Sequence, residues 1–168
     1  MKKRIKANKK GEVAQNEIIY RPIGIIHSPF GSIDGTPNQA TAGKDVEGII
    51  EIEPEYVEAL SDLEGFSHII LIYHFHLSAG YSLKIKPFRH DHIRGAFATR
   101  SPRRPNPIGM SVVRLVRIDG GKIYVKDIDV VDGTPLLDIK PYILDDRRRA
   151  LRIGWLSERT TSTCRRKL

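Results

Sequence analysis

Apolar and polar residues alternate on both sides of the tripeptide Asp-Gly-Gly at positions 119–121. Such alternation around a Gly-rich turn predicts two antiparallel strands joined as a β-hairpin, with one face of each strand in a core. The apolar positions are Val113, Leu115 and Ile118 before the turn and Ile123, Val125 and Ile128 after it. The hairpin therefore favours an antiparallel β fold.

The rest of the chain continues this pattern. Strand-like apolar stretches occupy 17–30, 46–54 and 67–77, and the last of these is the most apolar and is expected to be a central strand. Residues 54–65 predict a short helix, with Pro54 in the first turn. The chain has no internal repeat and no alternation of strands with helices, so we predict a mainly β protein, an antiparallel β-barrel with one or two short helices.

The charge divides the 168 residues into three parts. Residues 1–17 carry a net charge of +4 and residues 147–168 carry +7, whereas the body, 18–146, carries −3. We expect one folded domain at 18–146 between two basic tails, the first of them disordered. Basic ends on a slightly acidic body indicate phosphate contacts with a nucleic acid, or tails that only aid solubility.

Two features of the sequence bear on the compartment. The single cysteine, Cys164, excludes an internal disulfide and suits a reducing cytoplasm. No apolar stretch has the length of a signal peptide or a membrane span, so we expect a cytoplasmic protein without a membrane partner.

The segment RSPRRPNPIGMS, residues 100–111, contains three prolines and three arginines. Proline fixes its own φ angle and biases the preceding residue toward an extended conformation, so the segment is stiff and not helical. Arginine side chains bind carboxylates or phosphates through two parallel hydrogen bonds. A rigid ligand site is predicted here, and a rigid structural corner is the competing interpretation.

Two other segments are candidates for a site. Residues 31–45 form a long loop rich in Gly, Ser, Thr, Pro and Asn, and such loops are often functional. The turn Asp132-Gly133-Thr134-Pro135 is expected to leave backbone N–H and C=O groups free for a ligand, unless it is an ordinary surface turn.

Four histidines require an interpretation. His74 and His76 are two apart and are expected on one face of a strand, and His90 and His92 have the same spacing. Four imidazoles are able to bind Zn²⁺ or Fe²⁺, although packed or hydrogen-bonded histidines are more common. His76 is alternatively a ligand-orienting residue or a base. The sequence has no phosphate-binding glycine motif and no nucleophilic serine motif.

Three segments together resemble the TsaA-like family, also called TrmO: LEGFSHIIL at 63–71, FATRSPRRPNPIGMSVVRL at 97–115 and DGTPLLDIKPY at 132–142. The resemblance covers residues 23–143. It implies a single-sheeted β-barrel and an S-adenosylmethionine-dependent methyltransferase that acts on tRNA. It also implies a homodimer with the cofactor near the subunit interface, and methylation of threonylcarbamoyladenosine beside the anticodon.

The resemblance also assigns site residues. The family's cofactor contacts correspond to Pro37, Asn38 and Gln39, where Asn38 replaces a common Arg, and to His76, Leu77, Arg100, Met110, Asp132, Gly133, Thr134 and Pro135. Arg100 is expected to bind the cofactor's carboxylate, or else a tRNA phosphate. His76 and Asp138 are the two hypotheses for the base. Larger family members carry a further C-terminal domain, whereas a basic tail follows here, so both tails are expected to support tRNA binding.

Two other functions remain open at this point. The first is a basic β-barrel that binds RNA without catalysis and ignores S-adenosylmethionine. The second is a metal-dependent enzyme that uses the four histidines.

Overall fold

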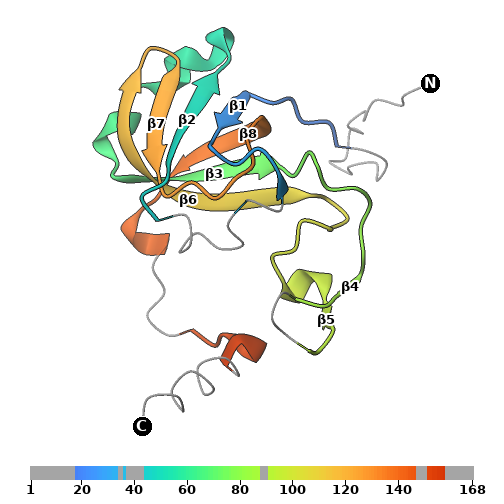
Figure 1. Ribbon diagram of the computed structural model, residues 1–168. Helices are drawn as coiled ribbons and strands as arrows, with labels where there is room; N and C mark the ends of the chain where they lie inside the picture. Colours follow the sequence, from blue (N-terminus) through green and yellow to red (C-terminus); the bar gives the residue numbers. More distant parts are fainter. Residues whose placement is uncertain (1–17, 34–35, 37–43, 88–90, 147–150, 158–168) are drawn as a thin grey trace, which may run out of the picture.

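The computed structural model describes residues 18–33, 36, 44–87, 91–146 and 151–157. Six strands close into one antiparallel barrel in the order β1-β2-β7-β6-β3-β8 (Figure 1). The strands are β1 (Gly24–His27), β2 (Glu47–Ile52), β3 (His68–His74), β6 (Ile108–Asp119), β7 (Lys122–Lys126) and β8 (Thr134–Pro141). The predicted mainly β, single-sheeted barrel is confirmed.

The predicted hairpin is β6–β7. Asp119 pairs with Lys122 across a turn in which Gly120 has a φ of 57°, a conformation that glycine adopts without steric cost. The register shifts between Leu115 and Arg117, so β6 carries a bulge there. The bulge explains why the apolar spacing lengthens from two to three residues at this point of the sequence.

The core is the barrel interior. Alternate residues of the strands point inward, and the fully buried side chains include Ile26, Ile50, Ile69, Leu71, Val113, Ile123, Val125 and Leu136. Burying each such side chain contributes about 1.5–3 kcal/mol. Most of them are isoleucine or valine, whose β-branched shapes suit a pleated, half-buried surface and favour strands over helices.

The helix predicted for 54–65 consists of two 3₁₀ segments, η3 (Pro54–Leu60) and η4 (Leu63–Gly65). Tyr56, Val57 and Leu60 pack against the core from one end of the barrel. Of the strand-like stretch 17–30, only Gly24–His27 forms a strand. Gly24 lies so close to β2 that a Cβ atom there would be 2.3 Å from the Glu51 carbonyl oxygen.

The strand pairing gives the barrel two distinct ends. Because neighbouring strands are antiparallel, β1, β3 and β7 finish at the end where β2, β6 and β8 begin. Three connections therefore leave from this end: 28–46, 75–107 and 127–133. We call it the site end. The opposite end, which we call the far end, carries η3, η4 and the β6–β7 turn.

The connection 75–107, which we call the lobe, projects from the site end (Figure 1). It contains a two-stranded ribbon of β4 (Lys84–Ile85) and β5 (Arg94–Gly95), followed by η5 (Ala96–Ala98). Near the C-terminus are η6 (Leu144–Asp146) and η7 (Gly154–Leu156), and Nε1 of Trp155 donates a hydrogen bond to the Ala98 carbonyl at 2.8 Å. Within the described ranges, no helix has the length and apolar character needed to span a membrane.

Candidate functional site

The structure brings most of the expected site residues to the site end of the barrel. His76 and Leu77 follow β3, and Arg100 lies in the lobe shortly before β6. The turn that begins at Asp132 enters β8 at the same end. These segments are far apart in the sequence, and the closure of the barrel is what makes them neighbours.

His76 is held by β8. Its Nδ1 lies 3.3 Å from the Thr134 hydroxyl oxygen, and that hydroxyl donates its only hydrogen to the Val131 carbonyl at 2.6 Å. Thr134 must therefore accept from His76, so Nδ1 carries the proton and Nε2 presents a lone pair. Thr134 is 2% exposed, which gives the exposed imidazole a rigid support. His76 thus has the tautomer that a base acting through Nε2 requires.

The expectation that His74 and His76 share a strand face is wrong. β3 ends at His74, because the Phe75 N–H then bonds to the Pro107 carbonyl at 2.8 Å and the chain turns. The Ser78 N–H returns to the Phe75 carbonyl at 3.0 Å. His76 is consequently a loop residue that points to Thr134 rather than a strand residue beside His74.

The turn 132–135 does not offer free N–H groups at its first two residues. The Asp132 N–H donates to the Phe30 carbonyl at 2.8 Å, and the Gly133 N–H donates to the Ile26 carbonyl at 2.9 Å. The Asp132 carboxylate accepts a 3.1 Å bond from the Ser28 N–H and lies 3.4 Å from Nδ1 of His27. Gly133 has a φ of 74°, so the turn needs a glycine there. The turn is a firm support for Thr134 and Pro135.

A polar chain that the sequence analysis did not single out runs from the barrel interior to the site end. The Ser111 hydroxyl donates to Oδ1 of Asp129 at 2.6 Å, so its oxygen accepts the 3.0 Å bond from the Tyr73 hydroxyl. Ser111 and Tyr73 are 4% exposed. The signal for Ser111 is its place as the last residue of the rigid segment 100–111, whereas nothing local marks Tyr73 or Asp129.

Burial has the largest effect on the pKa values of Tyr73 and Asp129 in this polar chain. Burial raises the pKa of Tyr73 to about 12, so the phenol stays protonated. Burial also raises the pKa of the Asp129 carboxyl, while the Ser111 hydrogen bond and the positive charge of Arg100 act in the opposite direction. The guanidinium of Arg100 therefore lies within electrostatic reach of the chain, and Arg100 itself is exposed. Its position links the rigid segment to the polar chain.

Met110 and Asp138 lie on the outer wall of the barrel. Ile72 of β3 pairs with Met110 on one side and with Asp138 on the other, so the three side chains form one outward row. Met110 is 55% exposed, and Oδ2 of Asp138 lies 2.8 Å from Nζ of Lys140. Asp138 is four residues along β8 from Thr134, or about 13 Å at the rise of a strand. The two candidate bases thus lie on different surfaces.

Some expected contacts lie outside the described residues. These are Pro37, Asn38 and Gln39 of the long loop, and His90 of the second histidine pair. Among the residues that the structure does describe, no group of three or more His, Cys, Asp or Glu side chains is arranged to hold a metal ion.

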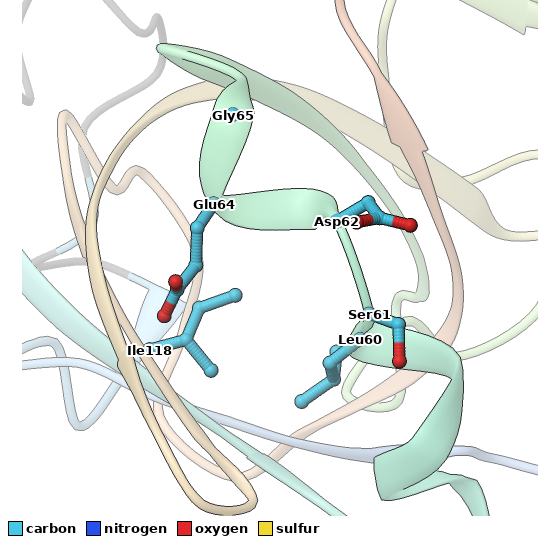
Figure 2. Close-up of a pocket in the computed structure, with 6 residues that line it drawn as sticks. All are labelled: Leu60, Ser61, Asp62, Glu64, Gly65 and Ile118. Carbon is cyan, nitrogen blue, oxygen red and sulfur yellow. The ribbon is translucent and has the colours of Figure 1, made fainter.

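Two hollows lie at the far end, away from these residues. One, of about 500 Å³, is lined by Leu60, Ser61, Asp62, Glu64, Gly65 and Ile118, and Figure 2 shows Ile118 and Leu60 on opposite sides of it. Its carboxylates, Asp62 and Glu64, would repel a phosphate. The other, of about 430 Å³, is lined by Phe66 and residues 142–145. Neither hollow includes a residue expected at the site.

Comparison with known proteins connects this arrangement to tRNA modification. Residues 25–146 match the model of the tRNA-methyltransferase O N-terminal domain. A probable S-adenosyl-L-methionine-binding protein of Pyrococcus abyssi is 56% identical over 142 residues, which are 84% of this chain and 77% of that protein. A tRNA (adenine(37)-N6)-methyltransferase of Rattus norvegicus is 34% identical over 90% of this chain and 39% of its own length.

A solved structure agrees with these matches. The crystal structure of TrmO from Pseudomonas aeruginosa superposes with a TM-score of 0.71 and 38% sequence identity, over 84% of this chain and 63% of that chain. The chain thus spans most of the archaeal relative, but less than two thirds of the rat and Pseudomonas proteins. The matched region, 25–146, contains the barrel, the lobe and the site end.

Proposed function

The chain belongs to the family of the tRNA-methyltransferase O N-terminal domain, and on this basis we propose that it is an S-adenosylmethionine-dependent methyltransferase. Its substrate is an adenosine of tRNA, methylated at N6, and more specifically the threonylcarbamoyladenosine beside the anticodon. The observation that carries the proposal is that the family match includes every described site residue at the site end. As tRNA modification requires access to tRNA, we place the protein in the cytoplasm.

The site-end residues fit the chemical groups of S-adenosylmethionine. The exposed guanidinium of Arg100 suits its carboxylate. Leu77, which is 49% exposed, offers apolar surface for the adenine ring, and Met110 of the outer wall adds to it once a second subunit covers that wall. The turn from Asp132 to Pro135 borders the same region through Thr134 and His76. The proposed contacts of Pro37, Asn38 and Gln39 complete the set.

The bound cofactor supplies a methyl group made electrophilic by its sulfonium. In the proposed reaction, the urea-like nitrogen of the tRNA base bonds to that carbon while the carbon–sulfur bond breaks. The proton of the nitrogen passes to Nε2 of His76, which the Thr134 contact leaves unprotonated. The rigid mounting of His76 favours alignment, which supplies much of the rate in an in-line displacement.

His76 and Asp138 are both proposals for the base, and geometry favours His76. Asp138 is paired to Lys140 on the outer wall, whereas His76 lies beside the turn at the site end. Asp138 joins the site only if a second subunit covers that wall. Comparing the effects of substituting His76 and Asp138 therefore also tests whether a second subunit covers the outer wall.

Methyl transfer from labelled S-adenosylmethionine to tRNA tests the function. The wild type is expected to methylate tRNA, and His76→Ala to lower kcat by about 10²–10⁴-fold, because it removes the proton acceptor. The measurement is the pH–rate profile, in which the variant is expected to lose the dependence on imidazole ionisation.

The pH–rate profile of Asp138→Ala is measured alongside that of His76→Ala. An unchanged profile in both variants removes both base hypotheses. Binding of tRNA without binding of S-adenosylmethionine by the wild type contradicts the methyltransferase and leaves an RNA-binding barrel.

The outer wall supports a homodimer with the cofactor near its interface. Outward positions of β3 and β6 are apolar over two neighbouring rows, with Ile70 paired to Val112 and Ile72 paired to Met110. Apolar surface of this kind often marks an interface between proteins. We propose that a second copy covers it, which brings Met110 and Asp138 to the edge of the shared site.

Ile72→Lys is expected to convert the proposed dimer to a monomer, because an interface that buries an unpaired ammonium group is strongly disfavoured. Sedimentation equilibrium measures the assembly. Leu144→Lys is the control, since Leu144 is 80% exposed and lies at the far end. A monomeric wild type, or a variant that remains dimeric with its fold intact by circular dichroism, contradicts this interface.

A further inference from the structure

The positive charge of the folded body is concentrated in the lobe. Residues 75–107 contain seven Lys or Arg and one acidic residue, a net charge of +6. The rest of the body, 18–74 and 108–146, contains seven Lys or Arg and sixteen Asp or Glu, a net charge of −9. The weakly negative total of the body therefore conceals one strongly basic segment on an acidic barrel.

The lobe also exposes large apolar side chains. Phe97 is 78% exposed, and Tyr81, Leu83 and Ile93 are each more than 60% exposed. The guanidinium of Arg104 lies 5.7 Å from the centre of the Phe97 ring. Arg104 is itself fixed, because it donates to the Thr99 carbonyl at 2.7 Å and to the Ala96 carbonyl at 3.2 Å. Phe97 is thus an exposed aromatic ring beside an anchored cation.

Backbone hydrogen bonds hold the basic and aromatic positions near one another. The Ala96 N–H donates to the Leu83 carbonyl at 3.0 Å, which places η5 beside the start of β4. The Ser82 N–H donates to the Arg103 carbonyl at 3.3 Å. Arg103 therefore takes part in one of these two contacts, and Lys84 and Phe97 are each one residue from the other. Lys84 and Arg103 are exposed, and neither forms an ion pair with any residue that the structure describes.

This combination of groups suits a single-stranded stretch of RNA. Lysine and arginine side chains bind its phosphates, and an exposed aromatic ring stacks on an unpaired base whatever the sequence. In paired RNA the bases are already stacked on one another, so a duplex gains little from the ring. The lobe contains both His76 and Arg100, so RNA bound to it would lie next to the candidate site.

We propose that the lobe is the docking surface for the single-stranded loop of the RNA substrate. Phosphates bind at Lys84 and Arg103, and a base stacks on Phe97. This proposal rests on the proposed function, and it places the main RNA contacts on the folded domain instead of on the basic tails.

The test compares full-length variants in their binding to an RNA stem-loop over a range of salt concentrations. Phe97→Ala is expected to weaken binding by roughly 5- to 150-fold, the effect of losing one stacked base. Lys84→Ala with Arg103→Ala is expected to reduce the slope of log K against log salt by about 1.4, for two lost phosphate contacts. A fully paired RNA duplex of equal length is expected to bind more weakly than the stem-loop and to be insensitive to Phe97→Ala.

Two variants at the far end are matched controls. Leu144→Ala removes an equally exposed apolar side chain, and Lys122→Ala removes an exposed cation. Both are expected to bind RNA as the wild type does. Thermal unfolding of every variant confirms that each one is folded, which is expected because the substituted side chains are exposed.

Calorimetry with S-adenosylmethionine separates this proposal from the proposed function. Phe97→Ala and the double variant of Lys84 and Arg103 are expected to bind the cofactor as the wild type does. If the wild type methylates tRNA and the lobe variants bind RNA with unchanged affinity and salt slope, the docking proposal is overturned and the function stands. If deletion of 1–16 and 158–168, the outer parts of the two basic tails, by itself removes the salt dependence, those parts bind the RNA and the proposal is also overturned. A wild type that binds stem-loop RNA through the lobe but binds no cofactor refutes only the function.

Discussion

Arg100→Ala is expected to weaken S-adenosylmethionine binding by about 1.5–3 kcal/mol, which is roughly 10- to 150-fold in affinity. The reason is that the variant would remove the proposed charge-assisted, two-point hydrogen bond to the cofactor's carboxylate. Arg100 is exposed at the site end, and its charge lowers the pKa values of Tyr73 and Asp129 against the larger effect of burial. Isothermal titration calorimetry measures the affinity directly.

Two comparison variants sharpen this result. Arg100→Lys keeps the charge and loses the planar geometry, so we expect an intermediate affinity. Arg103→Ala, three residues along the same rigid segment, is expected to leave cofactor binding unchanged. If Arg100→Ala binds the cofactor normally but binds tRNA weakly, Arg100 contacts a tRNA phosphate and the assignment to the carboxylate is refuted.

The same substitution has a consequence for the polar chain. The positive charge of Arg100 opposes the burial that raises the pKa of Asp129. Its removal is therefore expected to raise that pKa further, so that Asp129 takes up its proton at a higher pH in the variant than in the wild type.

Gly109→Ala is expected to lower the free energy of unfolding by about 1–3 kcal/mol, the usual cost of overpacking a core. A Cβ atom at this position would lie 2.1 Å from Cε2 of Tyr73. The Tyr73 ring cannot move aside at low cost, because its hydroxyl bonds to Ser111 and the ring packs edge-to-face with Phe75, with 5.3 Å between the ring centroids. Chemical denaturation and a fall in Tm of about 2–12 °C are the measurements.

Gly65→Ala is the control for this experiment. Gly65 lies at the far end, and a Cβ atom there meets nothing within 4 Å. Its substitution is expected to change stability by no more than about 0.5 kcal/mol. An equal loss of stability in both variants contradicts the packing argument. If Gly109→Ala is as stable as the wild type, the Tyr73 ring and β6 move apart more easily than their close contact indicates.

Local patterns predicted several strands of this barrel, but not the β4–β5 ribbon of the lobe or the 3₁₀ form of 54–65. The alternation around 119–121 predicts the β6–β7 hairpin because each strand needs one face toward a core and the turn needs glycine. The apolar run 67–77 predicts β3 for the same reason. The prolines at 102, 105 and 107 predict a non-helical segment before β6, and the structure has no helix there.

The location of the candidate site was also visible in part. The rigid arginine segment and the Gly-Thr-Pro turn were selected separately, each from its own residue types. The pairing of Thr134 with His76 was not predictable, because 58 residues separate them and no local pattern encodes their contact. The turn's N–H groups were expected to be free for a similar reason: their partners are Ile26 of β1 and Phe30 of the loop after it, both distant in the sequence.

The distribution of charge also depends on how distant segments are arranged in space. Net charge divided along the chain indicates two basic tails, whereas the arrangement in space reveals a basic lobe that projects from an acidic barrel (Figure 1). Residue type and spacing dictate strands, turns and rigid segments, because these depend on neighbours in the chain. The Tyr73–Ser111–Asp129 chain, the outward row of Met110 and Asp138 and the two ends of the barrel depend on strand register and closure, which arise only when distant segments pair.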